Sequence, residues 1–207
     1  MTAIHPNHFR VAIFGSARIK KDDARYKQVF RLAKMIAEEK MDIVTGGGPG
    51  LMNAASKGHH AGRKGKRLHS IGLTIKIPNE QFIGYHLDIR KDFKRFSGRL
   101  DKFMELSNAV VVAPGGIGTL LEFFYTWQLI QVKHICETPI ILLGENWQGL
   151  LAWIKKEMLR KKLMSKEDFK SIFVVKNNQE AMKLLRKIHQ DSLTNKHVCK
   201  SFRKYKG

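Results

Sequence analysis

Residues 109–122 read AVVVAPGGIGTLLE, and this stretch decides the fold class of the chain. Its first five residues are all apolar, with no alternating polar position, which is typical of a strand buried on both faces of a parallel sheet. The glycines at positions 115, 116 and 118 permit a tight turn in which backbone N–H groups can approach a ligand closely. The chain from Thr119 to about Val132 is expected to be helical. A buried strand, a glycine turn and a helix in succession predict one βα unit of a parallel sheet.

The same alternation of short apolar runs and longer helical patterns extends along the whole chain. We expect an α/β fold with one Rossmann-like, doubly wound parallel sheet and helices on both faces. Residues 1–190 would form this single domain, followed by a basic tail at 191–207, and the length of 207 residues agrees with one domain. The expected strands are 10–14, 41–45, 69–77, 109–113, 139–143 and 172–175, and the expected helices are 22–39, 51–61, 91–106, 119–132, 147–160 and 179–189, with a turn at 78–80.

Composition excludes several classes of protein. Hydrophobic residues make up 43% of the chain, enough for a sizeable core, so the chain is not disordered. Its apolar runs fall short of the ~18 residues that a membrane span needs, and its start lacks the basic and apolar segments of a signal peptide. The two cysteines, Cys136 and Cys199, give no disulfide framework of a secreted domain and no metal-site spacing. We therefore expect a cytoplasmic protein without a membrane partner.

The formal net charge is +20, from 38 Lys and Arg against 18 Asp and Glu. The basic excess is concentrated in residues 57–67 and in residues 186–207. Such stretches attract the phosphates of nucleotides, nucleic acids or anionic lipids, but they can also be a plain solvated surface. The tail has few aromatic residues and no stacking rhythm, so nucleic-acid binding is an alternative that is not favoured.

Three glycine-bearing loops follow expected strands, at 15–16, 46–50 and 115–118. Ligands of doubly wound sheets bind beyond the carboxyl ends of the strands, and the amides of a helix N-terminus favour a phosphate there. Tight packing also explains many single glycine turns, but two such loops on one sheet are stronger together. The candidate substrate-binding residues are Gly15, Ser16, Gly46, Gly47, Gly48, Gly50, Met52, Pro114, Gly115, Gly116, Gly118 and Thr119.

Two charged residues are candidates for chemistry at this edge. Glu122 lies one helical turn after Thr119 and therefore near the same ligand, although an acid in a first helical turn can also belong to a capping box. Arg99 lies in the segment RFSGRLDK at 95–102, just before the buried strand. Its guanidinium matches an oxyanion such as a phosphate, whereas the alternative is a helix with ordinary surface charges.

The stretches PGGIGTLLE at 114–122 and GGGPGLM at 46–52 resemble the Lonely Guy family of cytokinin-activating phosphoribohydrolases and bacterial nucleotide nucleosidases, long labelled "possible lysine decarboxylase". The resemblance covers roughly residues 11–143. It implies that Glu122 and Arg99 are catalytic, with Ser107 eight residues after the arginine. Ala17, Leu100 and Phe103 depart from the family pattern.

The implied reaction is hydrolysis of the N-glycosidic bond of a nucleoside 5′-monophosphate, AMP-like or a cytokinin riboside monophosphate. Its products are the free base and ribose 5-phosphate, and it needs no cofactor. A carboxylate suits this chemistry because the sugar becomes oxocarbenium-like in the transition state. Lysine decarboxylation is rejected because it uses pyridoxal phosphate on a Schiff-base lysine, and neither glycine loop offers one.

Two other functions remain open from the sequence: a non-catalytic carrier of a phosphorylated cofactor, and a nucleic-acid-binding protein that uses the basic surface. No metal site is expected, because the nine histidines lack ligand spacing and His59-His60 are adjacent on an expected surface turn.

The segment from Leu120 to Val132 predicts how the protein assembles. Its apolar residues lie on nearly every side of a helix, so it is either completely buried in one chain or part of an interface. The family resemblance implies dimers with active sites at the subunit junction. We therefore expect a homodimer that pairs through this helix and completes each site.

Overall fold

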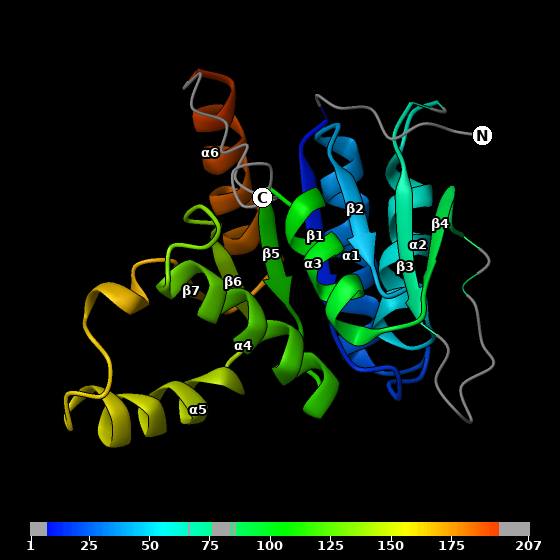
Figure 1. The fold of residues 1–207 in the computed structure, drawn as a ribbon. Helices are drawn as coiled ribbons and strands as arrows, with labels where there is room; N and C mark the ends of the chain where they lie inside the picture. The colour runs from blue at the N-terminus through cyan, green and yellow to red at the C-terminus, as the bar shows by residue number, and fades with distance from the viewer. Residues whose placement is uncertain (1–7, 66, 76–83, 85, 195–207) are drawn as a thin grey trace.

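The computed structural model describes residues 8–65, 67–75, 84 and 86–194. In this part of the chain, seven parallel strands form one sheet in the order β4-β3-β2-β1-β5-β6-β7 (Figure 1). The chain runs outward from β1 to β4, returns to the other side of β1 and runs outward again, which confirms the doubly wound α/β fold. The strands are β1 (Arg10–Phe14), β2 (Asp42–Thr45), β3 (Ser70–Ile75), β4 (Ile89–Phe93), β5 (Ala109–Val112), β6 (Ile140–Leu143) and β7 (Ile172–Val175).

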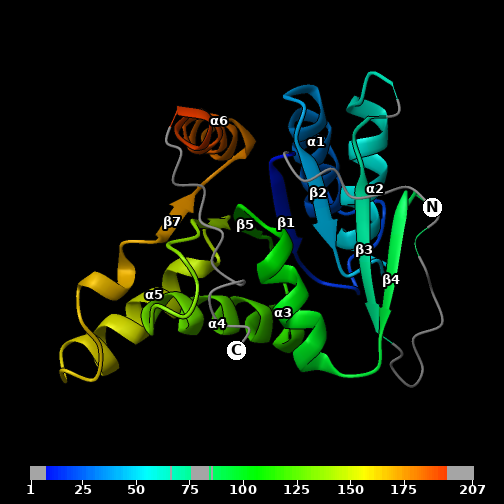
Figure 2. The same cartoon turned by 45° about the horizontal axis from the view of Figure 1, so that its top comes forward.

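Helices cover both faces of the sheet, as Figure 2 shows. One layer holds α1 (Ala24–Glu38), α2 (Leu51–Gly62) and α6 (Asn178–Thr194), and the other holds α3 (Phe96–Leu106), α4 (Ile117–Gln131) and α5 (Trp147–Ile154). The strands separate two cores because successive side chains point to opposite faces. Val11 and Ile13 pack with the first layer, whereas Ala12 and Phe14 pack with the second.

The prediction of a helix over residues 91–106 was wrong in its first part. Residues 89–93 form the edge strand β4, paired in parallel with β3 from Ile71↔Ile89 to Ile75↔Phe93, and the helix α3 begins only at Phe96. The reason is that an edge strand is paired on one side only and needs little apolar surface. The three central residues of β4 are exposed and polar, so no period-2 pattern marked them as a strand.

Other boundaries differ by less. Helix α5 ends at Ile154 and continues as a π-helix over Lys155–Leu159, and a 3₁₀ turn forms at Glu167–Phe169. Helix α6 continues to Thr194. The expected turn at 78–80, the last two residues of the expected strand 69–77, and residues 195–207 of the basic tail lie outside the described residues. No helix in the described part of the chain is long and apolar enough to cross a membrane.

Candidate functional site

The three glycine-bearing loops meet at the carboxyl edge of the sheet because β1 lies between β2 and β5. The backbone N–H of Ser16 donates to the carbonyl of Pro114 over 3.1 Å, and the N–H of Leu51 donates to the carbonyl of Ser16 over 2.9 Å. The loop after β1 is therefore the link between the other two loops. Their order along the sheet was not predictable from the sequence, which showed only that each loop follows a strand.

The loop after β2 is glycine-rich for reasons of conformation and space. Gly47 and Gly50 have φ values of +67° and +64°, in the left-handed region that side chains rarely adopt. A Cβ at Gly50 would also collide with the backbone carbonyl of Ser16. At Gly46, a Cβ would lie 2.7 Å from a guanidinium nitrogen of Arg99 and 2.7 Å from the sulfur of Met52. Packing thus accounts for the glycines at these positions, and it places Gly46 directly beside Arg99.

The loop after β5 leaves the N-terminus of α4 open. Helix α4 begins at Ile117, and its N-cap, Gly116, makes no side-chain capping hydrogen bond to the helix. A Cβ at Gly116 or Gly118 would meet no heavy atom within 4 Å in the described part of the chain. Free N–H groups at a helix start, with the positive end of the helix dipole, form a ready anion site.

Gly115 and Thr119 differ from their neighbours in this loop. A Cβ at Gly115 would collide with the Thr119 side chain, which is itself buried. These two residues therefore hold the loop against the helix, while Gly116 and Gly118 face outward. The pattern PGGIGT thus contains both packing positions and open positions.

Arg99 of α3 and Glu122 of α4 form a buried ion pair beside these loops. The Nη2 of Arg99 donates to Oε1 of Glu122 over 2.8 Å, and its Nε donates to the carbonyl of Leu73 in β3 over 2.9 Å. The two charged side chains are only 9% and 13% exposed. Arg99 is therefore not an ordinary surface charge, and its direction is fixed from both ends of the guanidinium.

Burial has a marked effect on the acid of this pair. It raises the pKa of Glu122 to about 7, and the charge of Arg99 opposes this shift. A carboxyl group with such a pKa can both take up and release a proton near neutral pH, as a general acid or base must. A capping box places its acid three residues after the N-cap. Glu122 lies six residues after Gly116, the N-cap of α4, so it is not part of a capping box.

A family comparison supports this reading of the motifs. The model of the family described as "Possible lysine decarboxylase" matches residues 52–185, more than half of the chain. The chain belongs to this family. The region matched includes Arg99, the PGGIGTLLE stretch and Glu122, so the resemblance to Lonely Guy proteins is confirmed at the level of the family.

Two relatives of known activity are similar to this member of the possible lysine decarboxylase family. The pyrimidine/purine nucleotide 5′-monophosphate nucleosidase of Escherichia coli (strain K12) is 29% identical over 145 residues, which cover 65% of this chain and 30% of that enzyme. The chain thus spans about a third of that relative's length. The cytokinin riboside 5′-monophosphate phosphoribohydrolase LOG7 of Arabidopsis thaliana is 28% identical over 155 residues, 71% of this chain and 67% of that enzyme.

Solved structures share the fold at lower identity. A molybdenum cofactor binding protein from Rippkaea orientalis has a TM-score of 0.65 and 19% identity, over 89% of this chain and 99% of that one. The DNA processing protein A of Helicobacter pylori, which binds single-stranded DNA, has a TM-score of 0.53 and 18% identity, over 86% of this chain and 80% of that one. These similarities establish the architecture of this family member and not its ligand.

The structure also shows site residues that the sequence did not reveal. The carbonyl of Leu73 orients Arg99, and the Tyr125 hydroxyl of α4 donates to Asp101 of α3, which ties together the two helices that carry the ion pair. Asn53 follows Met52 in α2, and its buried Oδ1 has no hydrogen-bond partner in the described residues. One signal was available in the sequence: Asn53 directly follows the glycine motif GGGPGLM. The Leu73 contact left no signal, because it uses a backbone carbonyl, which every residue has.

Proposed function

We propose that this protein hydrolyses the N-glycosidic bond of a nucleoside 5′-monophosphate and releases the free base and ribose 5-phosphate. The observation that carries the proposal is the buried Arg99–Glu122 pair, 2.8 Å apart and beside the open N-terminus of α4. A carboxyl group of near-neutral pKa next to an anion site is the combination that this reaction requires.

The residues divide the work between binding and chemistry. In this proposal the backbone amides at Gly116 and Gly118 bind the 5′-phosphate, and this places the ribose toward the ion pair. The bond between C1′ and the base nitrogen breaks, the electron pair leaves with the base, and a water oxygen bonds to C1′. Glu122 stabilises the positive charge on the sugar and takes the proton of the water, and that proton finally balances the charge of the released base.

Arg99 contributes in two ways to the proposed reaction. Its fixed positive charge holds the Glu122 carboxylate in position, and it can also bind a phosphate or ribose oxygen as the substrate enters. Both relatives of known activity are named for reactions of nucleoside 5′-monophosphates, which supports the same substrate class here. Neither glycine loop contains a lysine, so decarboxylation through a Schiff base is not supported by these residues.

Kinetics with a panel of nucleoside monophosphates tests this proposal. Purified protein is incubated with AMP, GMP, CMP, UMP and a cytokinin riboside monophosphate, and the free base is measured by chromatography. We expect Glu122→Gln and Arg99→Lys each to lower turnover at least about a hundredfold, or about 2.7 kcal/mol of transition-state stabilisation. Glu105→Gln, which changes a more exposed carboxylate paired with Lys102 on α3, is the matched control and should retain full activity.

Other results would contradict the proposal. Binding of a nucleotide without any turnover by the wild-type protein would indicate a carrier instead of an enzyme. Steeply salt-dependent binding of an oligonucleotide, without binding of any monophosphate, would indicate a nucleic-acid-binding protein.

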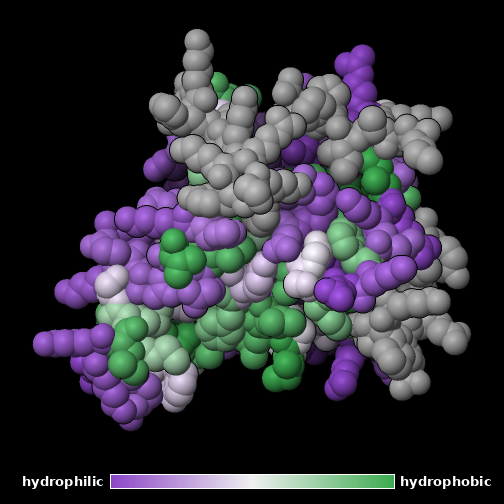
Figure 3. All heavy atoms as spheres, viewed as in Figure 1, coloured by the Kyte–Doolittle hydropathy of each residue, from purple (hydrophilic) through white to green (hydrophobic). Residues whose placement is uncertain are grey.

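We also propose that the protein is a homodimer, and the exposed face of α4 supports this. Figure 3 shows hydrophobic residues gathered over this helix. One side of α4 is buried, at Phe123, Trp127 and Ile130, but its other side leaves large apolar residues in solvent. Exposed apolar groups of this kind are typical of an interface. The exposed residues on this face are Ile117, Leu121, Phe124 and, just beyond the helix, Val132.

A further inference from the structure

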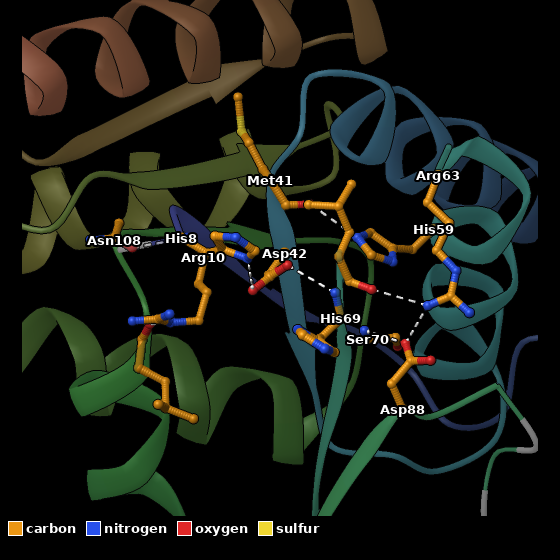
Figure 4. A network of polar contacts seen from close by, with 12 residues as sticks. His8, Arg10, Met41, Asp42, His59, Arg63, His69, Ser70, Asp88 and Asn108 are labelled. Carbon is orange, nitrogen blue, oxygen red and sulfur yellow. Dashed lines mark hydrogen bonds and ion pairs between the residues drawn. The ribbon is translucent and has the colours of Figure 1, made fainter. Parts of the chain in front are cut away.

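The opposite edge of the sheet carries a second group of chemically active side chains. His8 lies two residues before β1, Asp42 is the first residue of β2, and His69 immediately precedes β3. Because these three parallel strands are neighbours in the sheet, their N-terminal ends lie side by side, on the edge away from the glycine loops (Figure 4). The register pairs Arg10 with Asp42 and Ile43 with Ser70, which brings Asp42 level with His69.

One ligand atom from each of these residues lies within 4.8 Å of the other two. The Nδ1 of His8 is 3.1 Å from Oδ2 of Asp42, and the other oxygen of Asp42 accepts a hydrogen bond from the backbone N–H of His69 over 2.8 Å. Asp42 is completely buried, and His69 is nearly so. The second hydrogen bond fixes the direction of the Asp42 carboxylate, which leaves Oδ2 facing His8.

A second, independent observation concerns the ring of His69. The Nδ1 of His69 is buried and has no hydrogen-bond partner in the described part of the chain. A buried polar atom without a partner is costly, and native proteins seldom retain one without a ligand, ion or water. Asp88, the other acid labelled in Figure 4, is engaged elsewhere: its Oδ2 accepts from Arg63 over 2.7 Å and from the N–H of Ser70 over 2.9 Å, and its Oδ1 lies 3.4 Å from Nε2 of His60.

We propose that His8, Asp42 and His69 bind a divalent transition-metal ion, with zinc as the best match. Two imidazole nitrogens and one carboxylate oxygen form a common three-ligand set for zinc, with the fourth position left to water. Magnesium and calcium prefer sites made of oxygen atoms alone, so this set disfavours them. The site lies apart from Arg99 and Glu122 and is independent of the proposed hydrolysis.

The geometry requires only a small rearrangement. Ligands about 2.0–2.2 Å from a tetrahedral zinc ion lie about 3.4 Å from one another, so the 3.1 Å between His8 and Asp42 already suits the ion. The largest separation, within 4.8 Å, has to shorten by roughly 1.4 Å or less. His8 can supply this movement because its side chain is 22% exposed and it precedes the first strand. The same exposure gives the ion a path into the site.

Arg10, the register partner of Asp42, carries a positive charge close to this cluster, but its guanidinium bonds to another group. Its Nε donates to the carbonyl of Leu106 over 2.6 Å, and Figure 4 shows the guanidinium directed away from the Asp42 carboxylate. The guanidinium therefore points away from the place where the ion would bind. His59, also drawn in Figure 4, is a separate group, since its Nε2 donates to the carbonyl of Met41 over 3.0 Å.

Cobalt titration of the untagged, chelator-treated full chain tests the site. Four-coordinate Co²⁺ absorbs strongly in the visible range, and Zn²⁺ then displaces it, so both affinity and coordination are measured without any activity assay. We expect one equivalent of Co²⁺ per chain. His69→Gln and His8→Ala should each raise the dissociation constant about tenfold or more, and His134→Ala, at an exposed histidine, should bind as the wild type does.

The two variants keep the test decisive. His69 is buried, so His69→Gln could disturb folding, but His8 is half-buried and its replacement should leave the circular dichroism spectrum unchanged. If the folded His8→Ala protein binds Co²⁺ as tightly as the wild type does, the proposal is wrong. It is also wrong if the wild-type chain shows no four-coordinate spectrum, or if His134→Ala weakens binding to the same extent.

Discussion

The raised pKa of Glu122 makes a quantitative prediction about folding stability. Burial moves the pKa of this carboxyl group from 4.5 to about 7 in the folded protein, so the folded state binds the proton more tightly than the unfolded state does. The contribution of Glu122 to the free energy of unfolding is then greatest below pH 4.5 and is lost as the pH rises through 7. At 1.36 kcal/mol for each pKa unit, the loss is about 3 kcal/mol. Glu122→Gln removes the titrating group and should therefore remove this part of the pH dependence.

Denaturant unfolding of both proteins between pH 4.5 and pH 8, in buffers without phosphate, measures the effect. The wild-type free energy minus the variant free energy should fall by about 3 kcal/mol across this range and level off above pH 7. Arg99 keeps its charge throughout, so loss of its partner in the variant adds an offset that does not change with pH. A difference that stays constant within about 0.5 kcal/mol would refute the reasoning, because Glu122 would then titrate equally in the folded and unfolded states. A difference that rises with pH would also refute it, because the pairing with Arg99 would then outweigh burial.

Two further predictions concern binding and assembly. Gly116→Val places a side chain over the open start of α4. Binding of a nucleoside monophosphate, measured by calorimetry, should therefore be lost, while the midpoint of unfolding stays the same. The control is Gly149→Val, at another exposed glycine with no neighbour within 4 Å in the described residues, and this variant should bind normally. The wild-type chain should sediment at micromolar concentration with twice its mass of 23.8 kDa, and Phe124→Asp should give monomers. Leu193→Asp, on α6 of the opposite layer, should leave the dimer intact, and a wild-type monomer that hydrolyses nucleotides at full rate would contradict the interface.

Most of the architecture was predictable because buried strands of a parallel sheet have a simple pattern. Residues 11–14 and 109–113 are continuous apolar stretches with a glycine turn and a helix behind them, and the structure confirms strands at 10–14 and 109–112. Strand β4 was missed because its pairing with β3 depends on backbone hydrogen bonds at an edge, where side chains stay polar. No local pattern distinguishes such a segment from the start of the helix that follows it.

The histidines show a different limit of sequence reasoning. His59 was expected on a surface turn, but it lies within α2 and is completely buried, and burial lowers its pKa to about 4. Because the histidines lack ligand spacing, the sequence also predicted no metal site, yet His8, Asp42 and His69 come together at the starts of three neighbouring strands. Their separations along the chain are set by the lengths of the intervening helices, so only the strand order could reveal the cluster.

The candidate site was predictable in its residues but not in its contacts. The motifs identified Arg99 and Glu122 separately, as a guanidinium before β5 and a carboxyl group after it. That they touch follows from the packing of α3 beside α4, and that Arg99 is oriented by Leu73 follows from the position of β3 in the sheet. Those facts depend on tertiary structure, as does the burial that raises the pKa of Glu122.

The Arg99–Glu122 ion pair is better evidence for the proposed enzyme, as opposed to a carrier, than the glycine loops are. Gly46, Gly50 and Gly115 are explained by packing alone, since a Cβ at each would collide with its neighbours in a protein of any function. Packing does not explain why the Glu122 carboxylate is buried, because its burial lowers the free energy of unfolding by about 3 kcal/mol at pH 8. When natural proteins retain a destabilising feature of this kind, it usually lies at a functional site. A carrier that only holds a phosphate needs the open α4 start, whereas the proposed bond cleavage also uses the buried acid beside that start.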